Sequence, residues 1–329
     1  MDAPRFRITQ VEEWLYEHAA PDFAGMTNLP ESLRGELAEA FSLTPLDIAY
    51  EAVSQDGTVK HLWALADGQQ VESVLIPTTD RLTLCISSQV GCALRCRFCA
   101  TGYFGFRRQL RAAEIVAQYR DASRVAASRF ARPISNIVFM GMGEPLANMG
   151  ALNTALDVLH RGFGVGARRI TVSTVGLVRG ILELARRPEP FALAVSLHAP
   201  TQMLRTELVP VATRYPLGKL MEAVRAFANH KGRRITFEYT LIDGLNDDPQ
   251  LADTLADLLN DLLCYVNLIP FNPIPSVDWR PSPAERVRRF AARLESRGIA
   301  AGVRTPRGRD IDAACGQLRL ARGGPEPAA

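Results

Sequence analysis

Three cysteines lie close together in the segment Cys92-Ala-Leu-Arg-Cys96-Arg-Phe-Cys99, at spacings of four and three residues. Three such thiolates can each bind one iron of a cubane cluster and leave the fourth iron without a protein ligand. A structural zinc would need a fourth Cys or His nearby, but none follows within the next sixty residues. We therefore predict an iron-sulfur cluster with an open iron, with Phe98 shielding one of its faces. A zinc site completed by Cys85 or a distant His is the alternative.

Polar side chains follow four of the strands that the sequence predicts. Because the carboxyl ends of parallel strands meet on one face of a barrel, these side chains are expected to lie close together. We predict that they form a cradle for a cofactor, in which small glycines bring the backbone close to the ligand and a carboxylate accepts from an ammonium group. The residues are Glu144 in the segment Met140–Pro145, Ser173 with Thr174, Ser196 to His198, and Asn272.

Strand-like and helix-like segments alternate from residue 82 onward, which predicts a parallel sheet with helices outside it. Six or so units are too few for a closed eight-stranded barrel, so we expect an α/β fold with a partial (β/α)6 barrel. Strands are predicted near residues 82–87, 134–139, 168–173, 191–197, 235–241, 265–269 and 299–304. Helices are predicted near residues 112–127, 149–160, 177–186, 217–230, 250–263 and 283–297.

The N-terminal region has a different pattern. Two short helices with apolar stripes are predicted, the first at residues 9–18 and the second opened by Pro30, and an antiparallel meander follows with turns at Asp56-Gly57 and Asp67-Gly68. We divide the chain into an accessory region, 1–78, which is a candidate for RNA binding, and a barrel with a C-terminal loop that carries Cys315, 79–329. The stripes are Val11, Trp14, Leu15 and His18, then Leu33, Leu37, Ala40 and Phe41, and the meander strands are 48–53, 59–65 and 71–76.

The composition is that of a soluble globular protein, with 329 residues, of which 47% are apolar. No apolar run approaches the roughly 18 residues of a membrane span, and the first residues lack the apolar core of a signal peptide, so we expect a cytoplasmic protein with no membrane partner. The net charge of +3 favours a polyanionic partner only weakly. The final segment, 323–329, is expected to fray.

One segment mixes arginines with aromatic residues, a combination that binds nucleic-acid backbones and stacks unpaired bases. A solvated basic face around a core aromatic would have the same composition, so both interpretations stay open. The residues are Arg95, Arg97, Arg107, Arg108 and Arg111, interleaved with Tyr103, Phe104 and Phe106.

Three further cysteines remain. Cys264, among Leu262, Leu263 and Tyr265, has the surroundings of an inert buried thiol. Cys315 is flanked by small residues that leave its sulfur accessible, and Cys85 lies on the strand that leads into the cluster loop. For these two, inert and reactive roles are both open.

Five ordered motifs resemble the RlmN/Cfr group of the radical S-adenosylmethionine (SAM) superfamily, a group of RNA methyltransferases. They are residues 85–102, 141–145, 196–200, 270–273 and 310–318, and the resemblance extends from about Leu46 to Leu318. Within the group, the chain most resembles the RlmN branch. The resemblance implies methylation of carbon 2 of adenosine in 23S ribosomal RNA and in transfer RNA anticodon loops.

The resemblance also implies roles for individual residues. Cys92, Cys96 and Cys99 match the ligands of one [4Fe-4S] cluster. Cys315 matches a cysteine that carries the methyl group, Cys85 the thiol that resolves an enzyme-RNA adduct, and Glu72 a proton acceptor, although an exposed strand Glu is its ordinary interpretation. The positions that match SAM-binding residues are Gly143, Glu144, Ser173, Ser196, Leu197, His198 and Asn272.

In the scheme that the resemblance implies, two SAM molecules are used per turnover. One methylates the Cys315 thiolate, and the other is cleaved to a 5'-deoxyadenosyl radical that activates the methyl group. The carbon radical adds to the electron-poor adenine carbon, and Cys85 then attacks Cys315, which releases RNA and leaves a disulfide bond. The target base must first leave its stack.

The implied partners are 23S rRNA, tRNA and a flavodoxin-type reductant, with the protein acting as a monomer. Two alternatives stay open. A Cfr-like enzyme would methylate carbon 8 with the same motifs, and a zinc-containing RNA-binding protein would have no catalytic activity.

Overall fold

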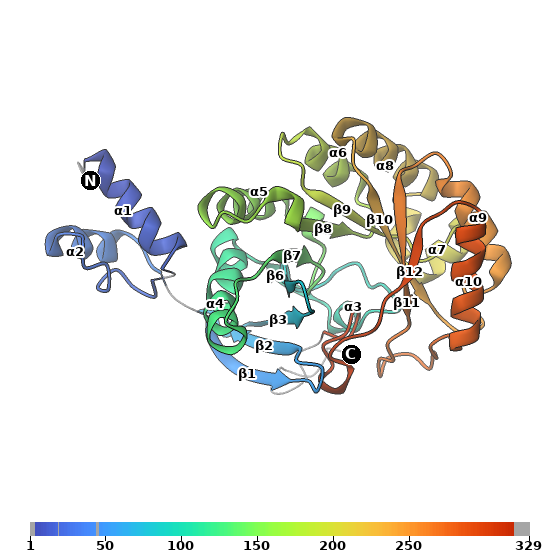
Figure 1. Ribbon diagram of the computed structural model, residues 1–329, viewed down its shortest axis with the longest axis horizontal. Coiled ribbons are helices and arrows are strands. Elements are labelled where there is room, and N and C mark those ends of the chain that lie inside the picture. Colours follow the sequence, from blue (N-terminus) through green and yellow to red (C-terminus); the bar gives the residue numbers. More distant parts are fainter. Residues whose placement is uncertain (1–3, 19, 44–45, 319–329) are drawn as a thin grey trace.

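A mixed sheet of ten strands runs through the main body of the protein (Figure 1). The computed structural model describes residues 4–18, 20–43 and 46–318, so the predicted frayed tail lies outside the described residues. The strand order is β1-β2-β3-β4-β7-β8-β9-β10-β11-β12, and the sheet ends at the two edge strands β1 and β12. The sheet is therefore open, as a partial barrel requires.

From β4 to β12, each strand of the sheet is parallel to the next. This confirms the parallel barrel that the alternation of segments predicts. The predicted strands agree with the observed ones to within a few residues. They are β4 (Leu82–Cys85), β7 (Asn136–Phe139), β8 (Ile170–Thr174), β9 (Ala192–Ser196), β10 (Ile235–Leu241), β11 (Cys264–Pro270) and β12 (Ala301–Val303).

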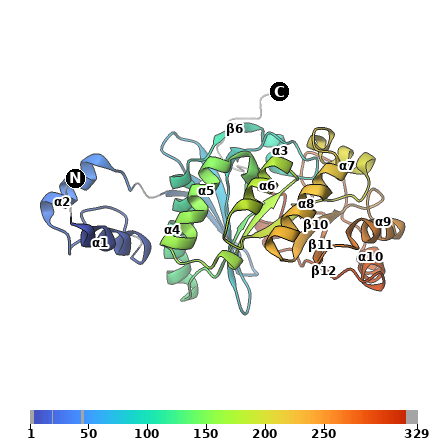
Figure 2. The same cartoon turned by 90° about the horizontal axis from the view of Figure 1, so that it is seen from above.

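Helices that connect the parallel strands lie outside the sheet (Figures 1 and 2). Their apolar residues recur every three or four positions, and α6 shows the result: Ile181, Leu184 and Ala185 are buried on its inner face. The helices are α4 (Ala112–Phe130), α5 (Met149–Asp157), α6 (Val178–Arg186), α7 (Gln202–Leu208), α8 (Leu217–Lys231), α9 (Pro249–Leu259) and α10 (Ala284–Ser296). The sequence analysis missed only the short α7 among them.

The predicted meander forms the antiparallel end of the same sheet. It consists of β1 (Asp47–Val53), β2 (Val59–Ala64) and β3 (Gln70–Pro77). Gly57 and Gly68 have positive φ angles of 82° and 78°, as the predicted Asp-Gly turns require. β3 pairs with β4, with Val74 opposite Cys85, so the sheet continues across the predicted boundary at residues 78 and 79. The division of the chain at that point stays a prediction.

The two N-terminal helices pack around a small core of their own. α1 (Arg5–Tyr16) and α2 (Glu31–Ala40) lie at one end of the molecule (Figure 1). The predicted stripes are correct for the residues that line this core, Val11, Trp14, Leu15, Leu33 and Leu37. His18, Ala40 and Phe41 are instead exposed, because the first helix ends before His18 and the apolar stripe of the second ends at Leu37.

A second, two-stranded sheet holds the cysteine-rich loop. β5 (Gln89–Gly91) and β6 (Phe106–Gln109) are antiparallel, and the short helix α3 (Ala100–Phe104) lies between them. None of these elements was predicted. Gly91 has a φ of 76°, and a Cβ added to it would lie 1.7 Å from the carbonyl oxygen of Gly105. The close approach of the two strands therefore requires glycine at this position.

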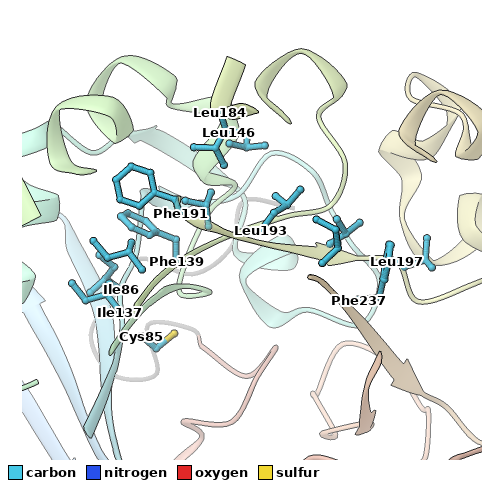
Figure 3. Close-up of a cluster of buried hydrophobic side chains, with 14 of the residues drawn as sticks. Cys85, Ile86, Ile137, Phe139, Leu146, Leu184, Phe191, Leu193, Leu197 and Phe237 are labelled. Carbon is cyan, nitrogen blue, oxygen red and sulfur yellow. The ribbon is translucent and has the colours of Figure 1, made fainter. Parts of the chain in front are cut away.

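The main core lies between the sheet and its helices. Figure 3 shows Ile137 and Phe139 from β7 and Leu193 from β9 packed with Leu146 and Leu184 from the outer layer. The same core includes apolar residues of the meander, so the meander and the barrel share one buried interior. The strands that carry the candidate site are thus fixed by continuous packing.

Candidate active site

The largest set of predicted site residues lines one cavity at the carboxyl ends of the parallel strands. Its empty volume is about 920 Å³, including space that is open to solvent. The cluster loop contributes one wall, and strand ends from β7 to β11 contribute the other. The predicted residues that line it are Cys92, Cys96, Phe98, Cys99, Gly143, Glu144, Ser173, Ser196, His198, Asn272 and Cys315.

Cys92, Cys96 and Cys99 all line this cavity, although they are separated by a turn of the loop. Backbone hydrogen bonds fix the turn: the Cys92 N–H donates to the Gly105 carbonyl and the Cys99 N–H donates to the Cys96 carbonyl. Burial raises the pKa of Cys92 to about 12 and also raises the pKa of Cys96 and Cys99. Buried thiolates need nearby cations, which the irons of a cluster would supply.

The arrangement of these thiols fits a cluster better than a zinc ion. Among the described residues, no group of three or more His, Cys, Asp or Glu side chains could hold a metal ion. A zinc site needs four ligands within about 2.3 Å of one ion. A cubane instead binds each thiolate through a different iron, so its cysteine ligands need not converge on one point.

Glu144 joins the ends of two neighbouring strands. Its carboxylate accepts hydrogen bonds from the Leu146 N–H at 3.0 Å and from the Val175 N–H at 2.9 Å. The side chain is buried, and this burial raises the pKa of Glu144 to about 7. A third hydrogen bond comes from the Thr174 side chain, and a carboxylate has about four acceptor sites, so one site remains for a ligand ammonium.

The two glycines before Glu144 have a packing role that the sequence analysis did not anticipate. A Cβ added to Gly141 would lie 2.6 Å from the Ile86 carbonyl oxygen, and one added to Gly143 would lie 2.5 Å from the Gln89 Cβ. Gly143 also has a φ of 96°. The glycines therefore let this loop pack against the segment that leads into the cluster loop.

Ser173, Ser196 and His198 present polar atoms to the cavity from β8 and β9. The hydroxyls of both serines have no hydrogen-bond partner among the described residues. Leu197 lies between Ser196 and His198 in the sequence, but its side chain points to the opposite side of the chain and is fully buried in the main core (Figure 3). Its side chain therefore does not line the cavity.

His198 is held as a neutral hydrogen-bond donor. Its Nδ1 accepts from the Thr240 N–H at 3.0 Å, so the proton of the neutral ring is on Nε2. Burial, together with the charge of Arg205, lowers the pKa of His198 to about 3. The Nε2 atom is buried without a partner among the described residues, and the ring packs against Phe98 with centroids 4.1 Å apart. A buried unpaired donor in a cavity wall fits a polar ligand such as SAM.

Asn272 lies in the cavity wall, but its amide holds the C-terminal loop. Its Nδ2 donates to the Cys315 carbonyl at 3.0 Å, and its Oδ1 accepts from the Arg309 Nε at 2.9 Å. On the other side of the loop, the Ala100 N–H donates to the Gly316 carbonyl at 2.7 Å. The loop that carries Cys315 is therefore bound to both a strand end and the cluster loop.

Cys315 lines two cavities. Besides the first, it lines a second cavity with an empty volume of about 510 Å³, whose wall includes Cys85. Burial and the charge of Cys315 raise the pKa of Cys85 to about 12, and Arg304 opposes this shift. All six cysteines are described, and all are free thiols, so the disulfide that the resemblance implies is not present in this structure.

Glu72 is buried, so the ordinary interpretation as an exposed strand residue is wrong for this position. Its carboxylate lies 3.4 Å from the Lys60 Nζ, which also donates to the Asp312 carbonyl at 3.2 Å. The reason is that β3 is buried on both faces, with every residue from Val71 to Leu75 buried, and α4 and β5 pack against it. Glu72 thus contacts the Cys315 loop through Lys60.

Two arginines near the site were missed by the sequence analysis. Arg304 lines both cavities directly after β12, where the rule that identified the other strand-end residues could have found it. Arg205 is fully buried on α7, where its Nη2 donates to the Val175 carbonyl, and burial lowers its pKa to about 10. Since α7 was not predicted, no sequence signal indicated Arg205.

Comparisons with known proteins agree with the geometry. The sequence model of the Radical SAM superfamily matches residues 86–255, and that of the Ribosomal RNA large subunit methyltransferase N-terminal domain matches residues 1–43. "Probable dual-specificity RNA methyltransferase RlmN" of Gemmatimonas aurantiaca is 47% identical over 97% of this chain and 87% of that protein. "Dual-specificity RNA methyltransferase RlmN" of Anaeromyxobacter sp. is 47% identical over 97% of this chain and 86% of that protein.

A solved structure is similar over nearly the whole chain. The crystal structure of a radical SAM methyltransferase from Sphaerobacter thermophilus superposes with a TM-score of 0.93 at 51% identity, covering 96% of this chain and 94% of that one. Separately, none of the helices in the described residues is long and apolar enough to span a membrane.

Proposed function

This chain belongs to the RlmN-type radical SAM RNA methyltransferases, and on that premise we propose that it methylates carbon 2 of adenosine in 23S ribosomal RNA and in transfer RNA anticodon loops. The names of its relatives describe dual-specificity RNA methyltransferases, which supports more than one class of RNA substrate. The match of residues 1–43 to a ribosomal RNA methyltransferase domain supports the first class.

The observation that carries the proposal is the position of Cys315. Cys315 lines the first cavity, together with the three cysteines of the cluster loop, and also the second cavity, together with Cys85. A methyl carrier must reach the methyl donor first and a resolving thiol later. One sulfur that borders both cavities can serve both steps without a rearrangement of the fold.

We propose that Cys92, Cys96 and Cys99 hold one [4Fe-4S] cluster, and that SAM binds in the first cavity. The unpaired Nε2–H of His198, the free hydroxyls of Ser173 and Ser196 and the remaining acceptor site of Glu144 support this assignment. Asn272 acts through the Cys315 loop that its amide holds. The backbone provides the contribution of Gly143 and Leu197. When bound, the cluster and two SAM molecules per turnover supply the methyl group and the radical that activates it.

The reacting residues then have separate roles. The Cys315 thiolate attacks the methyl carbon of SAM, the bond from that carbon to the sulfonium sulfur breaks, and the demethylated cofactor leaves as a neutral thioether. After the methylene has bonded to adenine, the ring loses its proton, and one electron passes to the redox centre that the three cysteines would hold. The Cys85 thiolate then attacks the Cys315 sulfur, the bond between that sulfur and the methylene breaks, a disulfide forms, and the base leaves as its new carbon takes up a proton. Glu72, which contacts the Cys315 loop through Lys60, is the proposed acceptor of the ring proton.

We extend the proposal to the surroundings of the enzyme. It acts as a monomer in the cytoplasm, where both RNA substrates and a flavodoxin-type reductant are found. Residues 1–78 form an accessory region, and residues 79–329 form the catalytic barrel with its C-terminal loop.

The test is methylation of unmodified ribosomal and transfer RNA by anaerobically reconstituted protein, followed by mass spectrometry of the nucleosides. We expect 2-methyladenosine from the wild type and none from Cys315→Ala, which should still cleave SAM. Exclusive 8-methyladenosine would overturn the position of methylation. A colourless protein with one zinc and no iron would support a non-catalytic RNA-binding protein instead.

A further inference from the structure

An open groove lies on the outer side of the cluster loop. It has an empty volume of about 990 Å³ and is lined by Arg95, Arg97, Gly102, Tyr103, Phe104, Gly105, Phe106 and Arg107. Cys92, Cys96 and Cys99 of the same loop line the first cavity instead. The loop therefore presents its thiols to one side and its arginines to the other.

The groove is positively charged, because three arginines and no acidic residue line it. Arg95 and Arg107 form no ion pair within the described residues, while Arg97 lies 3.3 Å from the Glu207 carboxylate. Arg95 also has a φ of 53°, a conformation that is rare for residues other than glycine, asparagine and aspartate. A phosphate backbone is the anionic partner that such a groove would fit.

The structure separates these arginines from two others in the same segment. Arg108 pairs with Asp67 at 2.6 Å and with Glu114 at 2.8 Å, and Arg111 pairs with Glu114 at 3.3 Å. Both charges are neutralised within the protein and hold β6 against α4 and the meander. Ion pairs within the protein therefore account for Arg108 and Arg111, and the nucleic-acid interpretation stays a prediction for Arg95, Arg97 and Arg107.

Aromatic faces accompany the unpaired charges. Tyr103 and Phe106 are each 42% exposed and line the same groove as the arginines, so their rings are accessible to a partner. Phe104 is partly buried against the main core, and the Arg107 guanidinium lies 5.8 Å from its ring centroid. Exposed rings beside guanidinium groups are the surface on which unpaired bases stack.

The groove is close to the loop that carries Cys315. α3 extends from Ala100, whose N–H donates to the Gly316 carbonyl, to Phe104 in the groove wall. Four residues of helix rise about 6 Å, so the groove begins roughly one helical turn from the Cys315 loop. Figure 2 shows α3 and β6 together at one edge of the molecule, where a large RNA can approach.

We propose that this groove binds the unpaired nucleotides that flank the target adenosine. A flanking base stacks on Tyr103 or Phe106, and its phosphates contact Arg95 and Arg107. This inference rests on the proposed function for the class of substrate. Because stacking and phosphate contacts do not read base edges, one groove can serve RNAs of different sequence, such as a ribosomal and a transfer RNA.

The test is binding of a fluorescein-labelled RNA stem-loop with an unpaired adenosine to the full chain, measured by fluorescence anisotropy. Arg107→Ala should weaken binding and reduce the slope of log K against log salt by about 0.7. Tyr103→Leu should weaken binding by about 5- to 100-fold, and Tyr103→Phe should bind as the wild type does. Arg111→Ala is the matched control, since it removes an equal charge that is already paired, and it should leave the affinity unchanged.

SAM cleavage and RNA methylation, measured beside RNA binding, separate the groove proposal from the proposed methyltransferase function. All four variants should cleave SAM as the wild type does, because none of these residues lines the SAM cavity. If Arg107→Ala and Tyr103→Leu bind RNA normally while the wild type methylates it, the groove is wrong and the function stands. Equal losses in Arg107→Ala and Arg111→Ala would also overturn the groove. If the wild type methylates no RNA but binding still depends on these residues, the groove stands without the function.

Discussion

The surroundings of Cys85 fit its proposed role as the thiol that resolves the enzyme-RNA adduct. It is buried, and its neighbours in the second cavity include Cys315 and Arg304. We predict that Cys85→Ala forms the covalent enzyme-RNA adduct but cannot release it, because among the described residues no cysteine besides Cys85 and the bonded Cys315 lines that cavity. A denaturing gel after one turnover should show RNA bound to the protein. Cys264→Ala, which removes a buried thiol outside both cavities, should show only free RNA, and so would Cys85→Ala if the resolving role were wrong.

The raised pKa of Cys85 predicts how release depends on pH. The thiolate is the nucleophile, and burial, the largest cause of the raised pKa of Cys85, persists in the adduct, so the thiolate fraction grows about tenfold per unit of pH between 7 and 9. Decay of a preformed adduct should therefore accelerate with pH across that range. Arg304→Met should slow the decay by roughly three- to tenfold, because the guanidinium favours the Cys85 thiolate. Arg307→Met, in the wall of the same cavity, is the control, and equal slowing by both variants would contradict the role of Arg304.

At the scale of elements, the cluster loop depends on one close contact between β5 and β6. Gly91→Ala should destabilise the fold by about 2 to 5 kcal/mol, because it adds backbone strain and a clash with the Gly105 carbonyl. We also expect loss of iron after reconstitution, since the Cys92 N–H donates to that same carbonyl. Urea unfolding and iron analysis measure the two effects. Gly218→Ala on α8, where an added Cβ meets nothing within 4 Å, should change neither, and normal iron in Gly91→Ala would show that the contact is dispensable.

Elements differ in how far the sequence predicts them. Long amphipathic helices and apolar strands such as β10 and β11 follow from periodicity, because packing against the sheet selects the same residues that the pattern contains. β5, α3 and β6 are each only three to five residues long, too short for a period, and they form because the loop folds back on itself. The expectation that polar residues directly after parallel strands meet on one face of the barrel identified Glu144, Ser173 and His198 as cavity residues. It could not reveal that the amide of Asn272 holds the Cys315 loop, since that contact joins residues 43 positions apart.

At the scale of the whole molecule, the N-terminal helices are distinct from the barrel. Their core of residues such as Phe23, Met26 and Leu37 is separate from the main core. Tyr16 links the two through an edge contact with Phe163, with ring centroids 5.1 Å apart. Phe6 and Phe41 are exposed by 57% and 59%, as they would be if they contacted a partner. The match of residues 1–43 to a methyltransferase N-terminal domain agrees with a separate folding unit.

We therefore predict that removal of residues 1–43 leaves iron content and SAM cleavage unchanged but lowers RNA methylation. The remaining chain should keep its iron and cleave SAM at the wild-type rate, because no residue of 1–43 lines either cavity or belongs to the cluster loop. We predict that methylation of RNA falls by at least about tenfold, on the premise that the N-terminal helices form a second RNA-binding surface linked to the groove. Iron analysis, SAM cleavage and tritium transfer to RNA measure the three properties. Loss of iron would show that the helices are needed for the barrel to fold, and unchanged methylation would show that they do not contact RNA.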